Sequence, residues 1–228
     1  MNKKVLILML VLLVSAATAE PLKQTVNVNK PKLSAGITLG TNGGVGGEIH
    51  GMVSNLTPDM PLNLRFSFGY SSLKPGVSAE ARRIFINDAT NGVPEENGYK
   101  YDYKFDLVFP FKILSLKRSY LYGGPRYSKF VANFKYIGGN EDFDITSDQW
   151  GLGLGLKAYF AMGNRFDFVT SAGIDYYFSS ELSGHDTRYS PDGEDVNARN
   201  DYTFDDADNA INNPTFQLRF LVGVNYHF

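Results

Sequence analysis

The sequence predicts an all-β fold: an eight-stranded antiparallel transmembrane β-barrel, built as an up-and-down meander and preceded by a cleaved signal peptide. Three observations predict it. Apolar residues recur at every second position over many segments, a period that belongs to strands rather than helices. The opposite face of each segment is rich in glycine and polar residues. The N-terminus has the parts of an export signal.

The N-terminal segment predicts export from the cell. A basic start precedes the apolar run from Val5 to Val14, and small residues end at Ala19. Because this run is too short to cross a bilayer as a helix, we expect residues 1–19 to be a signal peptide that is removed. A short polar leader, residues 20–31, then precedes a barrel domain over residues 32–228.

The composition excludes several classes of protein. Cysteine is absent, which excludes disulfide scaffolds, thiol catalysis and cysteine-based metal sites. A net charge of -2 gives no basis for nucleic-acid binding. The mean hydropathy is only -0.22, but an average conceals a membrane-spanning barrel, because half of each strand is polar. We expect no cofactor.

Eight segments carry the alternation in order along the chain. Weak strands over 33–40 and 44–53 meet at Asn42-Gly43, a strong hairpin signal. The others are expected at 62–70, 101–109, 120–136, 150–160, 166–178 and 216–228. The segment 150–160 is the clearest, and at ~3.3 Å per residue and a tilt of ~40° it spans roughly 25 Å, the height of an apolar bilayer band. In 120–136 the phase is unclear around Gly123-Gly124-Pro125, where we expect a bulge or kink.

The charged residues of the strands fall on the face opposite the apolar one, which predicts an inside-out barrel with a polar lumen. The expected lumen charges are Glu48, Arg65, Lys100, Asp102, Lys104, Asp106, Lys157, Asp167, Asp175 and Arg219. In a narrow barrel such charges pair across strands and close the lumen, because an unpaired buried charge is costly. An ion path along them is the alternative. We expect Glu48 and Arg65 to lie nearly opposite each other across a hairpin and to pair.

The lengths of the connections predict the orientation. Those near 55–61, 110–118 and 161–165 are short, whereas those near 72–98 and 183–213 are long. Outer-membrane barrels keep short turns in the periplasm and long loops outside. The segment 183–213 is rich in Asp and Glu, so we expect a solvated surface loop, with binding of Ca²⁺, or of Mg²⁺ shared with lipopolysaccharide phosphates, as the alternative.

The last segment alternates apolar residues up to an aromatic C-terminus, in the order Phe216, Leu218, Phe220, Val222, Val224, Tyr226 and Phe228. Together with the signal peptide and the alternating strands, this ending resembles the small outer-membrane β-barrel proteins of the OmpX, OmpW and OmpA-transmembrane-domain type. The resemblance covers essentially all of the mature chain. It implies an outer-membrane location in a Gram-negative-type bacterium, and a last strand that acts as the insertion signal for the barrel-assembly machinery.

The expected function is non-enzymatic: a monomeric scaffold in outer-membrane lipid and lipopolysaccharide, whose long surface loops serve structural or interaction roles such as adhesion or lipopolysaccharide contact. A small porin-like channel for hydrophobic or ionic solutes is the first alternative. A lipid A-modifying enzyme that uses a serine and a histidine is the second. His50 and His227 fall in strands, without a nucleophile elbow, and we expect them to line the lumen. The glycine runs at 43–47 and 151–155 do not open a helix, so they are not nucleotide loops.

Overall fold

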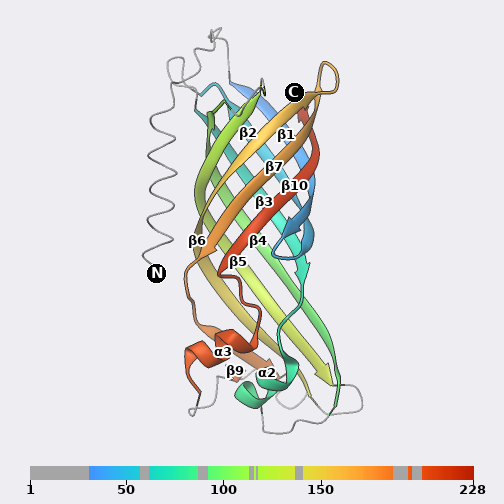
Figure 1. The fold of residues 1–228 in the computed structure, drawn as a ribbon, viewed down its shortest axis with the longest axis vertical. Helices are drawn as coiled ribbons and strands as arrows, with labels where there is room; N and C mark the ends of the chain where they lie inside the picture. Colours follow the sequence, from blue (N-terminus) through green and yellow to red (C-terminus); the bar gives the residue numbers. More distant parts are fainter. Residues whose placement is uncertain are drawn as a thin grey trace.

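The computed structural model describes residues 31–56, 62–86, 92–112, 116, 118–136, 141–186, 195–196 and 202–228, and Figure 1 shows its fold. The described strands are β1 (Lys32–Asn42), β2 (Val45–Ser54), β3 (Asn63–Leu73), β4 (Pro94–Pro110), β5 (Ser119–Tyr136), β6 (Asp142–Ala161), β7 (Phe166–Tyr177), β8 (Leu182–Asp186), β9 (Asp195–Val196) and β10 (Phe216–His227). The described helices are α2 (Ser78–Phe85) and α3 (Phe204–Ala210), and neither is long and apolar enough to cross a membrane. The predicted signal peptide and residues 20–30 of the leader lie outside the described residues.

Eight of the described strands close into a barrel. Each strand from β1 to β7 pairs antiparallel with the next, and β10 pairs with both β7 and β1. The strands β8 and β9 form a short flap on the early part of β6. The predicted eight-stranded up-and-down meander is therefore confirmed. Closure leaves no free strand edge, which is the condition for strands that face hydrocarbon.

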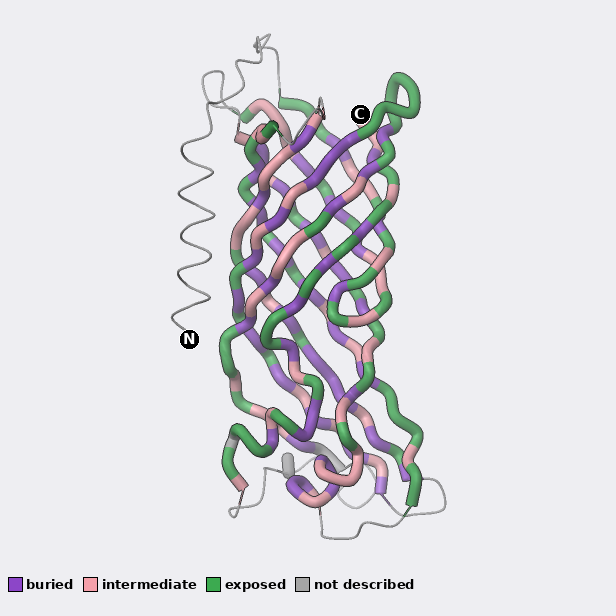
Figure 2. The backbone as a smooth tube through the Cα atoms, in the orientation of Figure 1, coloured by how far each residue is buried: buried purple, intermediate pink, exposed green. Residues whose placement is uncertain are grey.

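Side chains alternate between an apolar exterior and a polar interior along the barrel strands. On β10, Leu218 is 53% exposed, whereas its neighbours Gln217 and Arg219 are 7% and 1% exposed. Figure 2 shows the same alternation of buried and exposed positions around the barrel. The exposed side chains are mostly leucine, isoleucine, valine and phenylalanine, as a wall in contact with lipid requires.

The predicted starts of two strands and the predicted bulge in β5 are wrong, whereas a kink in β5 stays a prediction. β4 and β6 begin at Pro94 and Asp142, well before residues 101 and 150. No residue is inserted at Gly123-Gly124-Pro125, because β5 keeps one register with β6 from Ser119↔Ala158 to Lys135↔Asp142. The β4–β5 ladder lacks only its two pairs at Gly124 and Pro125 and resumes in the same register. Proline has no N–H to donate, so it interrupts the ladder there without adding a bulge.

The polarity of the wall inverts where β5 and β6 rise above the apolar belt. The rings of Tyr127 and Trp150, with centroids 5.2 Å apart, mark the boundary. Just beyond it the inward side chains are still polar, at Ser128, Ser147 and Gln149. Farther along they are apolar: Phe130, Ala132, Phe134, Tyr136, Phe143 and Ile145. The outward side chains there are Lys129, Val131, Asn133, Lys135, Asp142, Asp144, Thr146 and Asp148. Water has replaced lipid outside, so the apolar face turns inward toward protein. This inversion within one strand is the reason that the phase of 120–136 is unclear in the sequence.

The helices α2 and α3 cover this apolar inner face and form a cap with its own core. Ala81, Ile84 and Phe85 of α2 and Ala207 and Ala210 of α3 pack in one buried cluster with β5 and β6. Figure 1 shows both helices at the end of the barrel opposite the C-terminus. We call these the capped end and the C-terminal end. The short connection after β6, residues 162–165, lies at the C-terminal end.

Polar contacts join the connection between β3 and β4 to the connection between β7 and β10, and also to β5. Gly76 has φ 143° and pairs with Ile211, where a Cβ would collide with the Ala210 carbonyl oxygen. Arg82 lies over the Tyr136 ring at 4.4 Å and forms an ion pair with Glu141. Burial raises the pKa of the Tyr136 phenol, whose hydroxyl donates to the Ser78 carbonyl at 3.3 Å. The connections are therefore folded together where they are described.

The boundary between lipid and water on β6 is testable with one substitution at two outward positions. Leu154→Arg places a charge near the middle of the apolar belt and should destabilise the barrel by roughly 2–4 kcal/mol. Asp148→Arg, on the same face above Trp150, should change stability by only about 0.5 kcal/mol. Urea unfolding from lipid vesicles measures both. Equal losses would show that the boundary is misplaced.

Candidate functional site

All ten predicted lumen charges lie buried inside the barrel, each no more than 4% exposed. They come from β2, β3, β4, β6, β7 and β10 and face one another across a narrow bore. Figure 2 shows that the buried positions continue along the whole barrel. The lumen is therefore the candidate functional site, with the cap above it and a cavity below it.

Arg126 connects the two central carboxylates of the lumen. Its guanidinium contacts Asp106 at 2.7 Å and Asp175 at 2.8 Å. Asp106 also accepts from Arg65 at 2.6 Å, and Asp175 also pairs with Arg219. Three guanidiniums and two carboxylates thus form one network across the bore. Sequence reasoning missed Arg126 because it lies in the segment whose phase inverts, although the polar pair at 126 and 128 around Tyr127 gives a weak signal.

Asp102 is the centre of a second layer, nearer the capped end. It accepts hydrogen bonds from Lys100 at 2.7 Å, Asn42 at 2.6 Å and the Tyr177 hydroxyl at 2.9 Å. Lys100 also donates to the Gln217 side-chain oxygen at 2.5 Å. The layer joins β1, β4, β7 and β10, so polar contacts cross the lumen at this level.

The predicted pairing of Glu48 with Arg65 is wrong in its register. The structure places Glu48 opposite Gly69 and Arg65 opposite Met52. Glu48 forms its short ion pair with Lys104, at 2.9 Å, and the predicted pair with Arg65 is present as a longer contact of 4.0 Å. The turn between β2 and β3 does not centre where the sequence suggested, and a shift along antiparallel strands changes every partner.

Glycines on the inner face of β6 make room for the network. A Cβ at Gly153 would collide with Arg126 Nε, and a Cβ at Gly155 would collide with the Tyr122 ring. The Tyr122 ring in turn stacks 4.3 Å from the Arg65 guanidinium. The run at 151–155 therefore serves the packing of large polar side chains in the lumen.

A small apolar layer closes the lumen toward the C-terminal end. Met52, Tyr159 and Val169 are buried against one another, and Tyr120 packs on them. The Tyr120 and Tyr159 rings meet edge to face at 5.5 Å. We call these four residues the septum. Polar solutes that enter the barrel from this side reach the septum before the charge network.

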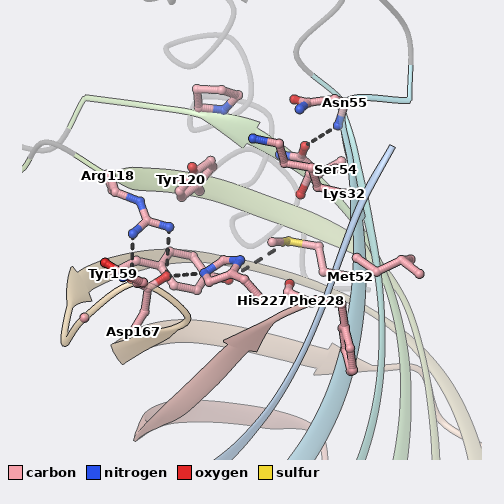
Figure 3. A pocket seen from close by; sticks show the side chains of 16 residues that line it. Lys32, Met52, Ser54, Asn55, Arg118, Tyr120, Tyr159, Asp167, His227 and Phe228 are labelled. Atoms are coloured by element: carbon pink, nitrogen blue, oxygen red, sulfur yellow. Dashed lines mark hydrogen bonds and ion pairs between the residues drawn. The ribbon is translucent and has the colours of Figure 1, made fainter. Parts of the chain in front are cut away.

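A cavity of about 670 Å³ lies below the septum at the C-terminal end. Figure 3 shows Arg118, Asp167 and His227 in contact on one wall of it. The Arg118 guanidinium donates to both oxygens of Asp167, at 2.6 and 2.8 Å, and His227 bonds to Asp167 at 2.5 Å. Both carboxylate oxygens of Asp167, at the rim of the lumen, therefore have hydrogen-bond partners. Arg118 is a residue of the candidate site that the sequence did not indicate.

Both histidines of the barrel strands have polar partners in the lumen. His50 bonds to Asn225 at 3.3 Å, and His227 bonds to Asp167 and Asn225. A carboxylate such as Asp167 on His227 is also the partner that orients the histidine of a serine hydrolase. Ser34 lies opposite His227 in the β1–β10 ladder. His185 is described only by its backbone in β8.

The acidic segment 183–213 is partly described. Asp205, Asp206 and Asp208 lie in α3, whereas Asp192, Glu194 and Asp201 lie outside the described residues. Over the described parts of the chain, no group of three His, Asp or Glu side chains is arranged to hold a metal ion. The apolar residues of the predicted assembly signal on β10 face outward, from Phe216 to Phe228.

The chain is similar in structure to a major outer membrane protein from Thermus thermophilus. The TM-score is 0.74, with 23% identity over 88% of this chain and 100% of the other. Neisserial surface protein A is also similar, with a TM-score of 0.35 and 13% identity over 87% of this chain and 96% of that one. No family model matches the chain, and no curated protein matches it. The predicted resemblance to small outer-membrane barrels is confirmed for the fold.

The central network predicts which charge pairs are coupled. Asp106→Asn leaves Arg65 and Arg126 without a shared carboxylate and should destabilise the barrel by roughly 3–5 kcal/mol. A double-mutant cycle of Arg65→Met with Asp106→Asn should give a larger coupling energy than the same cycle with Glu48→Gln. Urea unfolding from vesicles provides the free energies. Equal coupling in the two cycles would contradict the observed geometry.

Proposed function

We propose that this chain is a monomeric, non-enzymatic outer-membrane protein whose closed barrel presents the folded cap at the cell surface for interaction. The apolar exterior and the similarity in fold to an outer-membrane protein support the location. The N-terminal segment and the aromatic end of the last strand support export and insertion. The cap then faces outward, because short turns lie on the periplasmic side of such barrels.

The observation that carries this proposal is the closure of the lumen at successive levels. The cap core covers the capped end, two layers of paired charges cross the bore, and the septum closes the other side. A conducting pore needs a continuous hydrated path, whereas here large paired side chains reach across the bore at two levels. The geometry therefore favours display of the cap over transport of solutes.

The outer wall of β5 and β6 offers a place for lipopolysaccharide contact. Tyr103, Tyr127 and Trp150 form a row of tilted rings in contact at the upper edge of the belt, where amphipathic rings suit an interface. Lys129 is exposed on the same face of β5, two residues beyond Tyr127. Its ammonium group has the charge to meet lipid phosphate just above the apolar layer. Adhesion through the cap is a second interaction role that fits the same topology.

Planar-bilayer recording tests the closed lumen. The refolded mature chain should insert, as shown by a heat-dependent shift on an unboiled gel, and yet give no steady conductance. A porin recorded in the same bilayers controls for the insertion and the detection. Steady openings whose size changes in an Arg219→Gln variant would instead establish the channel as the function.

The folded cap predicts a local effect of core truncation. Phe134 is fully buried under the cap, so Phe134→Ala should cost about 3–5 kcal/mol of cap stability. Trypsin added to intact cells should then cleave after Arg82 or Arg83 faster than in the wild type, while the barrel keeps its heat-dependent shift. Val93→Ala, at a residue that is 84% exposed, is the matched control. If trypsin cleaves the cap in none of the variants, the cap does not lie at the cell surface and the proposal is wrong.

A further inference from the structure

The lumen between the cap and the septum carries more positive than negative charge. Among its described residues, the buried cations are Arg65, Lys100, Lys104, Arg126, Lys157 and Arg219. The buried carboxylates are Glu48, Asp102, Asp106 and Asp175. Asp167 lies below the septum, where Arg118 already neutralises it. Six cations therefore face four carboxylates inside a wall that is surrounded by lipid.

Lys157 is the cation without a carboxylate. Its side chain is 2% exposed, and its Nζ has no hydrogen-bond partner among the described residues. The Tyr159 ring centroid is 5.8 Å away, near the outer limit of a cation–π contact. An isolated buried ammonium group is far from its preferred aqueous environment, and such groups in proteins are normally paired. Such a group either loses its proton or takes a counter-ion from outside the protein.

The carboxylates that act on Lys157 are already engaged. Glu48 and Asp106 are the acidic groups whose charges reach it. Glu48 forms an ion pair with Lys104 at 2.9 Å. Asp106 forms ion pairs with Arg65 and Arg126 at 2.6 and 2.7 Å. Turning either one toward Lys157 would leave another buried cation unpaired. The excess of positive charge thus cannot be removed by rearranging the network.

Other polar atoms without partners lie on strands across the bore from Lys157. In the eight-strand order, β2 is opposite β6, and β3 is next to β2. On these strands His50 Nδ1 and Ser67 Oγ are buried and lack a hydrogen-bond partner in the described structure, and His50 and Ser67 are direct cross-strand neighbours. The charge of Lys157 also acts on His50. A cation thus faces a wall with hydrogen-bonding capacity that the protein leaves unused.

We propose that the lumen binds a small inorganic anion of the halide class at Lys157, with Ser67 and His50 as hydrogen-bonding neighbours. The anion compensates the ammonium charge in the low-dielectric interior. The septum separates the site from the cavity at the C-terminal end, so the anion is enclosed with the charge network and stabilises the folded barrel. This site is independent of the interaction role of the cap.

Halide-dependent stability of the refolded mature chain tests the proposal. The midpoint of thermal unfolding is measured in micelles at constant ionic strength, while sodium gluconate is replaced by sodium bromide. A ligand that binds only the folded state raises the midpoint with the logarithm of its concentration. The wild type should show this rise. Lys157→Met should lose it and should be more stable than the wild type in gluconate, because the unpaired charge is gone.

Lys32→Met, which removes an exposed cation at the C-terminal end, is the control and should keep the bromide dependence. Crystals grown in bromide give a second measurement that needs no variant: an anomalous peak beside Lys157 Nζ is expected. An equal bromide dependence in wild type and Lys157→Met would overturn the proposal, since it would mark a general salt effect. No dependence, or no peak in the lumen, would also overturn it.

Discussion

The rest of this structure depends on one constraint: no backbone N–H or C=O group can be left unpaired in hydrocarbon. The chain meets it by closing β1 on β10, so that every strand of the barrel has two neighbours. With eight strands the bore is narrow, and inward side chains from facing strands come into contact. Closure therefore forces the interior charges to pair, because a buried charge without a partner is costly. The network around Arg126 follows from the closed sheet.

Which side chains turn inward depends on the medium outside the wall, and this medium differs between the belt and the capped end. Within the belt, lipid lies outside and the polar side chains turn inward. Above Tyr127 and Trp150, water lies outside and the apolar side chains of β5 and β6 turn inward, where α2 and α3 cover them. One continuous pair of strands thus supports both a polar lumen and an apolar cap core. The cap and the barrel are therefore built on shared strands.

Lys157 departs from the pairing that the rest of the lumen follows. Its neighbours on the network are held by ion pairs between 2.6 and 2.9 Å, whereas its own Nζ has no such contact among the described residues. Departures from a rule that a protein otherwise keeps are where function is expected. The septum lies between this position and the cavity at the C-terminal end.

The sequence by itself determined which face of each strand meets lipid, because alternation with period two assigns every side chain of a strand once one is assigned. The inward position of Asp106, Asp175 and Arg219 could therefore be read from the sequence, as could the eight-stranded meander. Only the tertiary structure decided the partners. Pairing depends on register and closure, which placed Lys104 rather than Arg65 against Glu48. The tertiary structure also showed Arg126 to lie in the lumen. The sequence did not show this, because the polarity of β5 inverts just beyond that residue, at a boundary that is a property of the folded barrel in its surroundings.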